Sequence, residues 1–302
     1  MSREIIPSFK DPEKRNIFMK KVLADLDSLK VMFDKDLFEK DVHRIGAEQE
    51  LHFIDQRYQP VSIAADVMEK LNDSQLTSEY ARFNLEINAE PLELTKDAFG
   101  KLEENLRRKI KDINSAAKDY KAQALMTGIL PTLRRKHMQR DNLSPGPRYE
   151  VMLDLVNESR GTDYEFHIEG EDKLITRDNP VVFGGAFTSF QVHLQIDPDK
   201  AAELYNWAQV ISAPVLAACT NSPLFLNKKL WYETRVALFP QTADTRKPYN
   251  NPEAEKPRVF FGDSWVDHHI IEVFRRDVAD FRPLVSTQID ENSKKMIEEG
   301  KT

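Results

Sequence analysis

Four short segments in which polar and apolar side chains alternate constrain the fold of this chain most. They are Arg44–Ile54, Arg82–Leu92, Ser189–Ile196 and Tyr232–Phe239. Neighbouring side chains of a β-strand point to opposite sides, so alternation with a period of two predicts a strand with one buried and one polar face. We therefore predict an antiparallel sheet whose polar face is built from these segments.

The polar faces of the predicted strands carry the following side chains: Glu48, Glu50, His52, Glu86, Asn88, Glu90, Gln191, His193, Gln195, Glu233 and Arg235. Any one of these strands, taken alone, reads as an ordinary half-exposed strand. Solvent faces of sheets, however, are richer in threonine, serine and lysine. Several glutamates on one surface repel one another and become partly protonated unless cations neutralise them. Oxygen-rich sites suit Mg²⁺ or Mn²⁺ and tolerate one imidazole, so the sequence predicts such a metal site.

Magnesium that is held by few protein carboxylates commonly binds phosphate as well. The chain has 10 glycines and contains neither a Walker sequence nor a G-x-G-x-x-G motif, so phosphate recognition must come from metal and arginine. Arg235 is the strongest candidate, because a guanidinium binds two phosphate oxygens at once. A cross-strand pair between Glu233 and Arg235 explains the same spacing equally well. No motif for a catalytic serine or cysteine is present.

Apolar residues at steps of three and four predict helices over Glu13–Phe33, Thr95–Ala124, Arg148–Ser159, Asp199–Cys219 and Ser264–Val278. Helices and strands do not follow strict βαβ order, which predicts an α+β fold with helices packed outside the sheet. Residues 131–147 and 240–258 are polar, rich in proline and aperiodic, so we expect long loops of the kind that form lids. No repeat or flexible linker divides residues 1–302, which predicts a single catalytic domain.

The net charge of −7 and the isoelectric point near 5.6 argue against a nucleic-acid or anionic-membrane partner, because both would repel an acidic surface. The single cysteine, Cys219, excludes an intrachain disulfide and suits a reducing compartment, and its apolar neighbours predict a buried thiol. The start of the chain lacks the apolar core of a signal peptide, and no apolar run approaches the roughly 20 residues of a membrane span. We therefore expect a cytoplasmic protein.

In order along the chain, eight segments resemble those of glutamate–cysteine ligases and related carboxylate–amine ligases: RIGAEQELHFID, FNLEINAEPLEL, TGILPTL, SPGPRYEVM, FQVHLQI, NSPLF, ETRVALFPQTADTR and VFFGDSW. The resemblance extends from about residue 44 to about residue 280. Its specificity lies in the ordered set, because each segment alone is a weak signal. It implies a glutamine-synthetase-like fold, in which a curved antiparallel sheet forms a funnel or saddle with helices outside.

The resemblance also implies roles for individual residues. The metal ligands that it indicates are Glu48, Glu50, Glu86 and His193. It implies catalytic roles for Glu50 and for Arg235 beside the transferred phosphate. Nucleotide or substrate binding is implied for Gln191, His193, Arg148, Tyr149 and Arg246. Whether Glu90 or Glu93 joins Glu86 on the second strand stays open, because Pro91 interrupts the pairing.

The implied reaction is ATP-dependent formation of an amide bond between L-glutamate and L-cysteine through an acyl phosphate, a reaction of glutathione biosynthesis, with Mg²⁺ or Mn²⁺ as cofactor. A related ligase with another carboxylate or amine is the close alternative, and a nucleotide-binding regulatory protein without turnover is the alternative of a different class. The family usually has one more Glu-x-Arg strand near the end of its catalytic domain. This chain lacks it, so we expect a truncated chain without the last catalytic strands.

Overall fold

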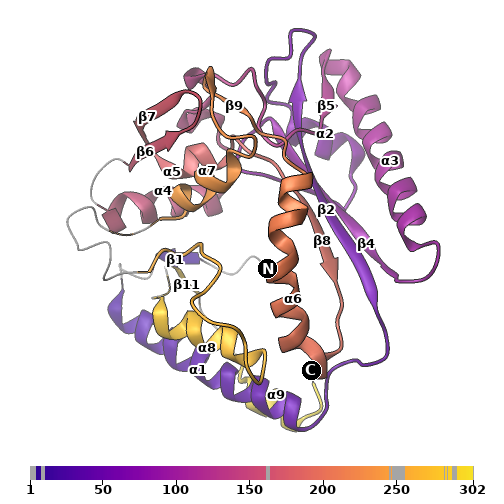
Figure 1. Ribbon diagram of the computed structural model, residues 1–302, viewed down its shortest axis with the longest axis vertical. Coiled ribbons are helices and arrows are strands. Elements are labelled where there is room, and N and C mark those ends of the chain that lie inside the picture. The colour runs from indigo at the N-terminus through magenta and orange to yellow at the C-terminus, as the bar shows by residue number, and fades with distance from the viewer. Residues whose placement is uncertain are drawn as a thin grey trace.

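The computed structural model describes residues 5–7, 11–160, 164–244, 246, 256–281, 283, 285–287 and 291–301. Within these residues helices and strands are mixed along the chain, and the strand pairs are antiparallel (Figure 1). The α+β class predicted from the sequence is thus confirmed. The described strands form an open five-stranded sheet and separate two-stranded pairs. The funnel or saddle curvature implied by the resemblance stays a prediction.

The five-stranded sheet is organised around β2. Its members are β2 (Arg44–Ile54), β3 (Leu76–Ser78), β4 (Asn84–Glu93), β5 (Gln123–Leu125) and β8 (Phe190–Leu194). One edge of β2 pairs with β4, which in turn pairs with β3. The other edge is shared, because β8 lies opposite residues 45–49 and β5 lies opposite residues 52–54. Glu50 therefore lies where β2 passes from one neighbour to the next.

The register of β2 and β4 aligns the polar residues of the two strands. Glu50 lies directly opposite Glu86, and Glu48 lies opposite Asn88. Directly opposed residues of antiparallel strands have Cβ atoms about 4.5–5.5 Å apart, so these side chains share one face and meet. The pairing then shifts at a bulge beside Pro91, which has no N–H to donate to the ladder.

The other face of the sheet is covered by α2 (Ala64–Leu71) and α3 (Ala98–Ala117), as Figure 1 shows. The buried cluster between helices and strands consists of Leu51, Phe53, Ile63, Ala64, Val67, Leu76, Leu85, Ile87, Ile113, Ala116, Ala117 and Ala122. Burying one large aliphatic side chain of this kind stabilises the fold by about 1.5–3 kcal/mol. This packing fixes which way the strands face and puts the glutamates on the opposite side.

A second core lies beyond the end of β2. The elements around it are α4 (Pro147–Arg160), β6 (Tyr164–Glu169), β7 (Lys173–Asp178), α5 (Pro180–Gly184) and α7 (Arg235–Thr242). The ring of Phe183 lies 4.5 Å from that of Phe166 and 5.5 Å from that of Phe225, measured between centroids. Ile54 and Phe83 belong to the same cluster, so the central sheet connects the two cores.

Gly170, which follows β6, packs directly against the backbone of Leu230. A Cβ atom at Gly170 would lie 2.6 Å from the Cα and carbonyl carbon of Leu230, closer than van der Waals contact allows. We predict that Gly170→Ala lowers the free energy of unfolding by about 1–3 kcal/mol, because backbone must move to admit the methyl group. Gly100→Ala in α3 meets no atom within 4 Å and should raise it by about 0.5–1 kcal/mol. Urea unfolding measures the contrast, and equal stability of the two variants would contradict the close approach.

Both ends of the described chain meet in a separate helical layer. Helix α1 (Pro12–Asp34) packs against α8 (Ile271–Asp280) and α9 (Ser293–Glu298) (Figure 1). The Asp11 side chain caps α1 by accepting a hydrogen bond from the Lys14 amide at 2.9 Å. The remaining elements are β1 (Ile5–Pro7), β11 (Val285–Thr287), α6 (Ala201–Ala218), β9 (Leu224–Phe225), β10 (Lys228–Lys229), and the 3₁₀ turns at 118–120, 135–137, 140–142 and 198–200.

Several predicted elements are confirmed, and others are wrong. Strand β2 has the predicted bounds, while β4, β8, α1, α4 and α6 differ from prediction by a few residues. The predicted strand Tyr232–Phe239 is wrong, because helix α7 begins at Arg235 and buries Leu238 in the second core. A short apolar run fits either a strand or a helix, and here packing decides. The thiol of Cys219 is exposed, not buried as its apolar neighbours predict.

Two predicted helices are too long, and some elements were not predicted. Residues after Ala117 turn into β5, and α8 begins only at Ile271. Helix α2 and the hairpin of β6 and β7 had no prediction. The loop predicted at 131–147 contains only short 3₁₀ turns before α4 begins. The loop predicted at 240–258 begins too early, because α7 extends to Thr242, and residues 245 and 247–255 lie outside the described part of the chain. Among the helices that the structure describes, none has the length and apolar character that crossing a bilayer requires.

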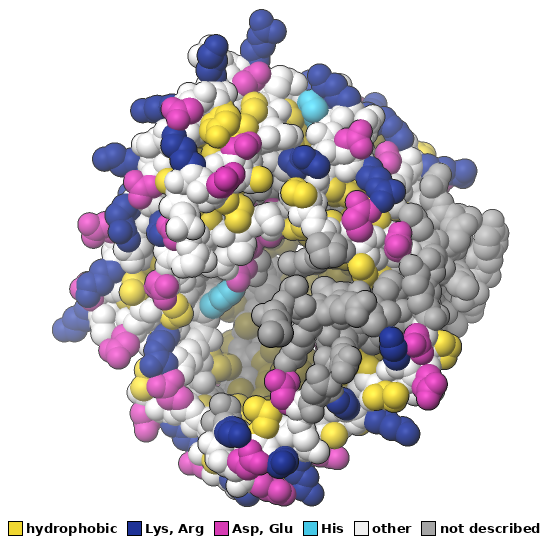
Figure 2. Space-filling model, turned by 180° about the vertical axis from the view of Figure 1, so that it is seen from behind, with side chains coloured by type: hydrophobic (Ala, Val, Ile, Leu, Met, Phe, Trp, Pro, Cys, Tyr) yellow, Lys and Arg dark blue, Asp and Glu magenta, His cyan; other side chains and the backbone are white. Residues whose placement is uncertain are grey.

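Charges of both signs are distributed over the surface. Lysine and arginine side chains are interspersed with carboxylates across the face shown in Figure 2. Many charged side chains of the described residues form exposed ion pairs, such as Arg177 with Glu165 on the hairpin of β6 and β7, where nitrogen and oxygen are 2.9 Å apart. Such exposed pairs contribute about 0–1 kcal/mol each. On this face the acidic residues are therefore mixed with basic ones.

Candidate active site

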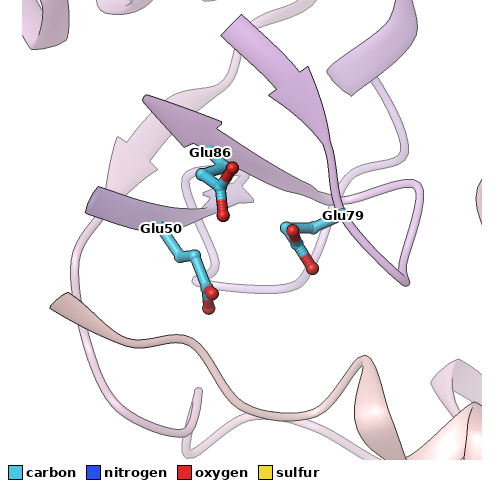
Figure 3. Close-up of side chains that lie close together, drawn as sticks. All are labelled: Glu50, Glu79 and Glu86. Atoms are coloured by element: carbon cyan, nitrogen blue, oxygen red, sulfur yellow. The ribbon is translucent and has the colours of Figure 1, made fainter. Parts of the chain in front are cut away.

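Three carboxylates converge on the polar face of the central sheet. Glu50 from β2 and Glu86 from β4 lie opposite each other, and Glu79 approaches from the loop after β3 (Figure 3). One oxygen from each carboxylate lies within 4.8 Å of the other two, and all three residues are half-buried. Figure 3 shows the three side chains pointing toward a common centre. Pairing of the strands thus brings together three carboxylates that come from three different segments of the chain.

Pairing of β3 with β4 explains how Glu79 and Glu86 come together. Thr77 lies opposite Glu86 and donates its hydroxyl to the Glu86 Oε1 atom at 2.8 Å. Asn88, on the same face, donates to the same oxygen at 2.9 Å. Glu79 is two residues beyond Thr77, so extended backbone directs it to the same face. Both donors use one oxygen of Glu86, which orients the carboxylate without occupying its Oε2 atom.

The environment of Glu50 favours a bound cation. Burial raises the pKa of the Glu50 carboxyl, hydrogen bonds from Ser189 oppose this, and the negative charges of Glu86 and Glu48 raise the pKa further. Carboxylates this close together repel one another when ionised, and a divalent cation would relieve the repulsion. Three carboxylate oxygens without a thiolate ligand suit Mg²⁺ or Mn²⁺ better than Zn²⁺. The residues present therefore fit the predicted metal.

Two further predicted ligands form a pair beside this cluster. The Nε2 atom of His193 lies 3.4 Å from the Glu48 Oε1 atom. Gln191 lies opposite Glu48 in the ladder between β2 and β8. Both β8 side chains are exposed. Since Glu48 and Glu50 are two residues apart on β2, the pair and the three carboxylates occupy the same face of the sheet.

A polar cavity of about 440 Å³ adjoins the carboxylates. Its lining residues are Ser74, Thr77, Ser78, Glu79, Glu86, Asn88, Pro145, Gly146 and Tyr149. Tyr149 donates its hydroxyl to the carbonyl oxygen of Ser78 at 3.0 Å, which holds the ring in the wall. The structure therefore places Tyr149 beside Glu79 and Glu86. The side chain of Arg148 lies outside the described residues.

Two of the three predicted arginines, Arg235 and Arg246, are paired with nearby carboxylates. The Nε and Nη2 atoms of Arg235 donate to the two oxygens of Glu233 at 2.6 and 2.7 Å. The Nη1 atom donates to the Thr188 carbonyl at 2.7 Å. The pair with Glu233 that the spacing allowed is thus present, although it joins the turn before α7 to the first residue of that helix and does not lie across strands. The Nε and Nη2 atoms of Arg246 likewise donate to Asp244, each at 2.9 Å.

His52 is fully buried, although it shares the strand face of Glu48 and Glu50. Its Nδ1 atom lies 2.9 Å from the Asn84 Oδ1 atom, and Asn84 donates to the Gly185 carbonyl at 2.9 Å. Burial lowers the pKa of His52 to about 4, with the hydrogen bond to Asn84 opposing the shift. The folded protein therefore keeps this imidazole neutral at neutral pH. His52 acts as a core residue that ties β2 to the segment after α5.

The low pKa of His52 predicts a loss of stability in acid. The folded value of about 4 lies below the ordinary value of 6.5, so only the unfolded chain binds this proton between them. Stability should fall as pH drops from 6.5 toward 4, by about 3 kcal/mol in full. The raised pKa of Glu50 has the opposite effect on stability, so the free energy of urea unfolding is best measured against pH in Glu50→Gln. Its dependence on pH should be weaker in the double variant Glu50→Gln/His52→Gln than in Glu50→Gln. Equal dependence in the two variants would contradict the lowered pKa of His52.

Two residues of this site, Glu79 and Ser189, were not predicted to take part in it. Strand β3 has only three residues, which is too few for alternation to show, so nothing in the sequence marks the face of Glu79. Ser189 holds the Glu50 carboxylate from a position 139 residues later in the chain. A contact of that range has no local pattern. The only sequence signal near Ser189 is its place just before the alternating residues of β8.

Comparison with known proteins gives one result that covers most of the chain. A family model described as glutamate-cysteine ligase family 2 (GCS2) matches residues 44–292. The match begins at the first residue of β2 and includes every strand and loop that carries the carboxylates described above. A search of curated proteins found no match.

Proposed function

The chain belongs to glutamate-cysteine ligase family 2, whose members are ligases, and on this basis we propose that it forms an amide bond between L-glutamate and L-cysteine at the expense of ATP. In the proposed reaction a carboxylate oxygen of glutamate attacks the γ-phosphorus of ATP, and ADP leaves. The amine of cysteine then attacks the acyl phosphate, inorganic phosphate leaves, and the nitrogen releases a proton. No covalent bond to the protein is needed.

The observation that supports this proposal most is the convergence of Glu50, Glu79 and Glu86. These carboxylates would hold Mg²⁺ or Mn²⁺, which supplies positive charge to bind and neutralise the phosphates of ATP. Without a cation, three carboxylates within 4.8 Å of one another would repel a nucleotide. The donor chemistry therefore links the metal and the nucleotide in one hypothesis.

The remaining residues of the face would bind and orient the reactants. Glu48 and His193 extend the site along β2 and β8 and are proposed to contact the same metals and phosphates. The cavity beside Glu86, with the amide of Asn88 and the ring of Tyr149 in its wall, has the size and polarity for a small polar substrate. Orientation of two reactants in one site accounts for a large part of catalysis in bond-forming reactions.

ADP release provides the direct test. Purified protein with ATP and Mg²⁺ should release ADP only when both L-glutamate and L-cysteine are present, and mass spectrometry should detect the γ-linked dipeptide. ADP release that requires another amine would show a related carboxylate–amine ligase. ATP binding without hydrolysis stimulated by any amino-acid pair would contradict the proposal and support a regulatory nucleotide-binding protein. A stable phosphorylated product would indicate a kinase.

A further inference from the structure

Both oxygens of the Glu50 carboxylate are held by one residue. The amide of Ser189 donates to the Oε2 atom at 2.7 Å, and the Ser189 hydroxyl donates to the Oε1 atom at 3.1 Å. The Glu50 amide in turn donates to the Ser189 carbonyl at 3.0 Å. Each carboxylate oxygen has two lone pairs, so these bonds leave one on each oxygen for a cation. Ser189 therefore fixes the orientation of Glu50 without blocking it.

Ser189 is itself held in place through the residue before it. Thr188 is buried, and its amide donates to the Gly128 carbonyl at 2.9 Å. The Thr188 hydroxyl donates to the Thr127 carbonyl at 2.6 Å. The remaining polar group of Thr188, its carbonyl oxygen, accepts the bond from Arg235 at 2.7 Å. The peptide unit that joins Thr188 to Ser189 is thus bound at one end by Arg235 and at the other by Glu50.

Arg235 is firmly placed by its surroundings. Each of its three guanidinium nitrogens has a hydrogen-bond acceptor, and the two bonds to Glu233 neutralise its charge. A Cβ atom at Gly128 would lie 2.8 Å from the guanidinium carbon, so the glycine admits the guanidinium against the backbone. The side chain of Arg235 is only 21% exposed. Because its three nitrogens already have acceptors, this guanidinium is better suited to fixing the protein backbone than to binding the transferred phosphate.

We infer that Ser189 and Arg235 are positioning residues for Glu50: Arg235 fixes the Thr188 carbonyl, and Ser189 presents its amide and hydroxyl to the metal-binding carboxylate. The inference rests on the proposed function only in taking Glu50 as a metal ligand. Hydrogen-bond partners of metal ligands commonly change metal affinity by about 10–100-fold when they are removed. Arg235 therefore influences the cation through a single peptide unit and not by touching the nucleotide.

Direct binding of Mn²⁺, measured by the electron paramagnetic resonance signal of the free ion, tests the inference without turnover. Ser189→Ala and Arg235→Gln should each weaken Mn²⁺ binding by about 10-fold or more. The double variant should be little weaker than the worse single variant, because both changes disturb the same contact. Ser189→Thr keeps a hydroxyl and should restore most of the affinity.

Matched controls separate this effect from general damage. Arg177→Gln removes an arginine that also pairs with a glutamate, but on the exposed hairpin, and should leave Mn²⁺ binding unchanged. Ser115→Ala on α3 is the corresponding serine control. If Arg235→Gln does not fold, Arg235→Lys serves instead, because one ammonium keeps the charge beside Glu233 without the fixed three-way geometry of the guanidinium.

Three results would overturn the inference. The first is wild-type Mn²⁺ affinity in Ser189→Ala. The second is an Arg235 variant that binds Mn²⁺ normally but binds ATP more weakly, which would show a direct phosphate contact. The third is absence of Mn²⁺ binding by the wild-type protein. Failure to release ADP with normal Mn²⁺ binding and normal variant effects would count against the proposed ligase reaction and leave the positioning roles standing.

Discussion

Glu50→Gln should lower the rate of ATP-dependent ligation by about 100-fold or more, because the variant loses a full negative charge from the centre of the proposed metal site. Glutamine keeps the size of glutamate and can still accept a hydrogen bond from Ser189, so the change isolates the charge. Steady-state ADP release at saturating and limiting Mg²⁺ measures it. The same substitution at the exposed Glu69 of α2 is the control and should leave turnover unchanged.

The same variant should be more stable than the wild type when no metal is present. Burial and the charges of Glu86 and Glu48 raise the pKa of Glu50, so ionised Glu50 destabilises the folded protein near neutral pH. Removing the charge removes that contribution, as is common where a site has been arranged for function and not for stability. Urea unfolding in a chelating buffer would show it. Full turnover, or lower stability without metal, would each contradict the role given to Glu50.

Glu79→Gln should have an effect of similar size, although Glu79 was not among the residues predicted from the sequence. Its carboxylate completes the set of three within 4.8 Å, so its loss leaves the cation with two of these oxygens. We expect a fall in turnover of about 100-fold or more and weaker Mn²⁺ binding. Steady-state ADP release measures the turnover, and the electron paramagnetic resonance signal of free Mn²⁺ measures the binding.

Glu90→Gln and Glu93→Gln are the matched controls for Glu79. Both residues are exposed and lie on β4, at or beyond the bulge beside Pro91, whereas Glu86 lies before it. We expect each control to retain wild-type turnover. Lower turnover in Glu90→Gln or Glu93→Gln, with normal turnover in Glu79→Gln, would contradict the role of Glu79. It would show that the third carboxylate of the site comes from β4, from one of the two residues between which the resemblance did not decide.

The sequence predicts the part of the site that follows from the alternation of side chains along the strands. The positions of Glu48, Glu50, Glu86 and Asn88 follow from alternation, and the register confirms that they face one another. Alternation predicts which way a side chain points but does not predict whether it is buried. His52 has the expected orientation but is covered, because Asn84 and the backbone of Gly185 close over it.

Arg235 and Ser189 show what the sequence leaves out. The spacing of Glu233 and Arg235 fits a pair as well as it fits a phosphate-binding arginine, and the two residues do pair, but in a turn that leads into a helix. Residues two apart meet in more than one backbone conformation, so the contact is predictable and the element is not. The clamp of Ser189 on Glu50 arises only when two segments far apart in the chain come together.

The shared edge of β2 has a consequence for the order in which the molecule assembles. One side of β2 pairs with β4, which follows within a few tens of residues, and this side carries Glu86. The other side waits for β8, whose pairing closes a loop of well over a hundred residues, and loops of that length close slowly and late. We therefore expect the three carboxylates to come together before β8 docks, and the proposed cation site to be complete only when Ser189, just before β8, reaches Glu50. Tight metal binding should therefore report the docking of β8.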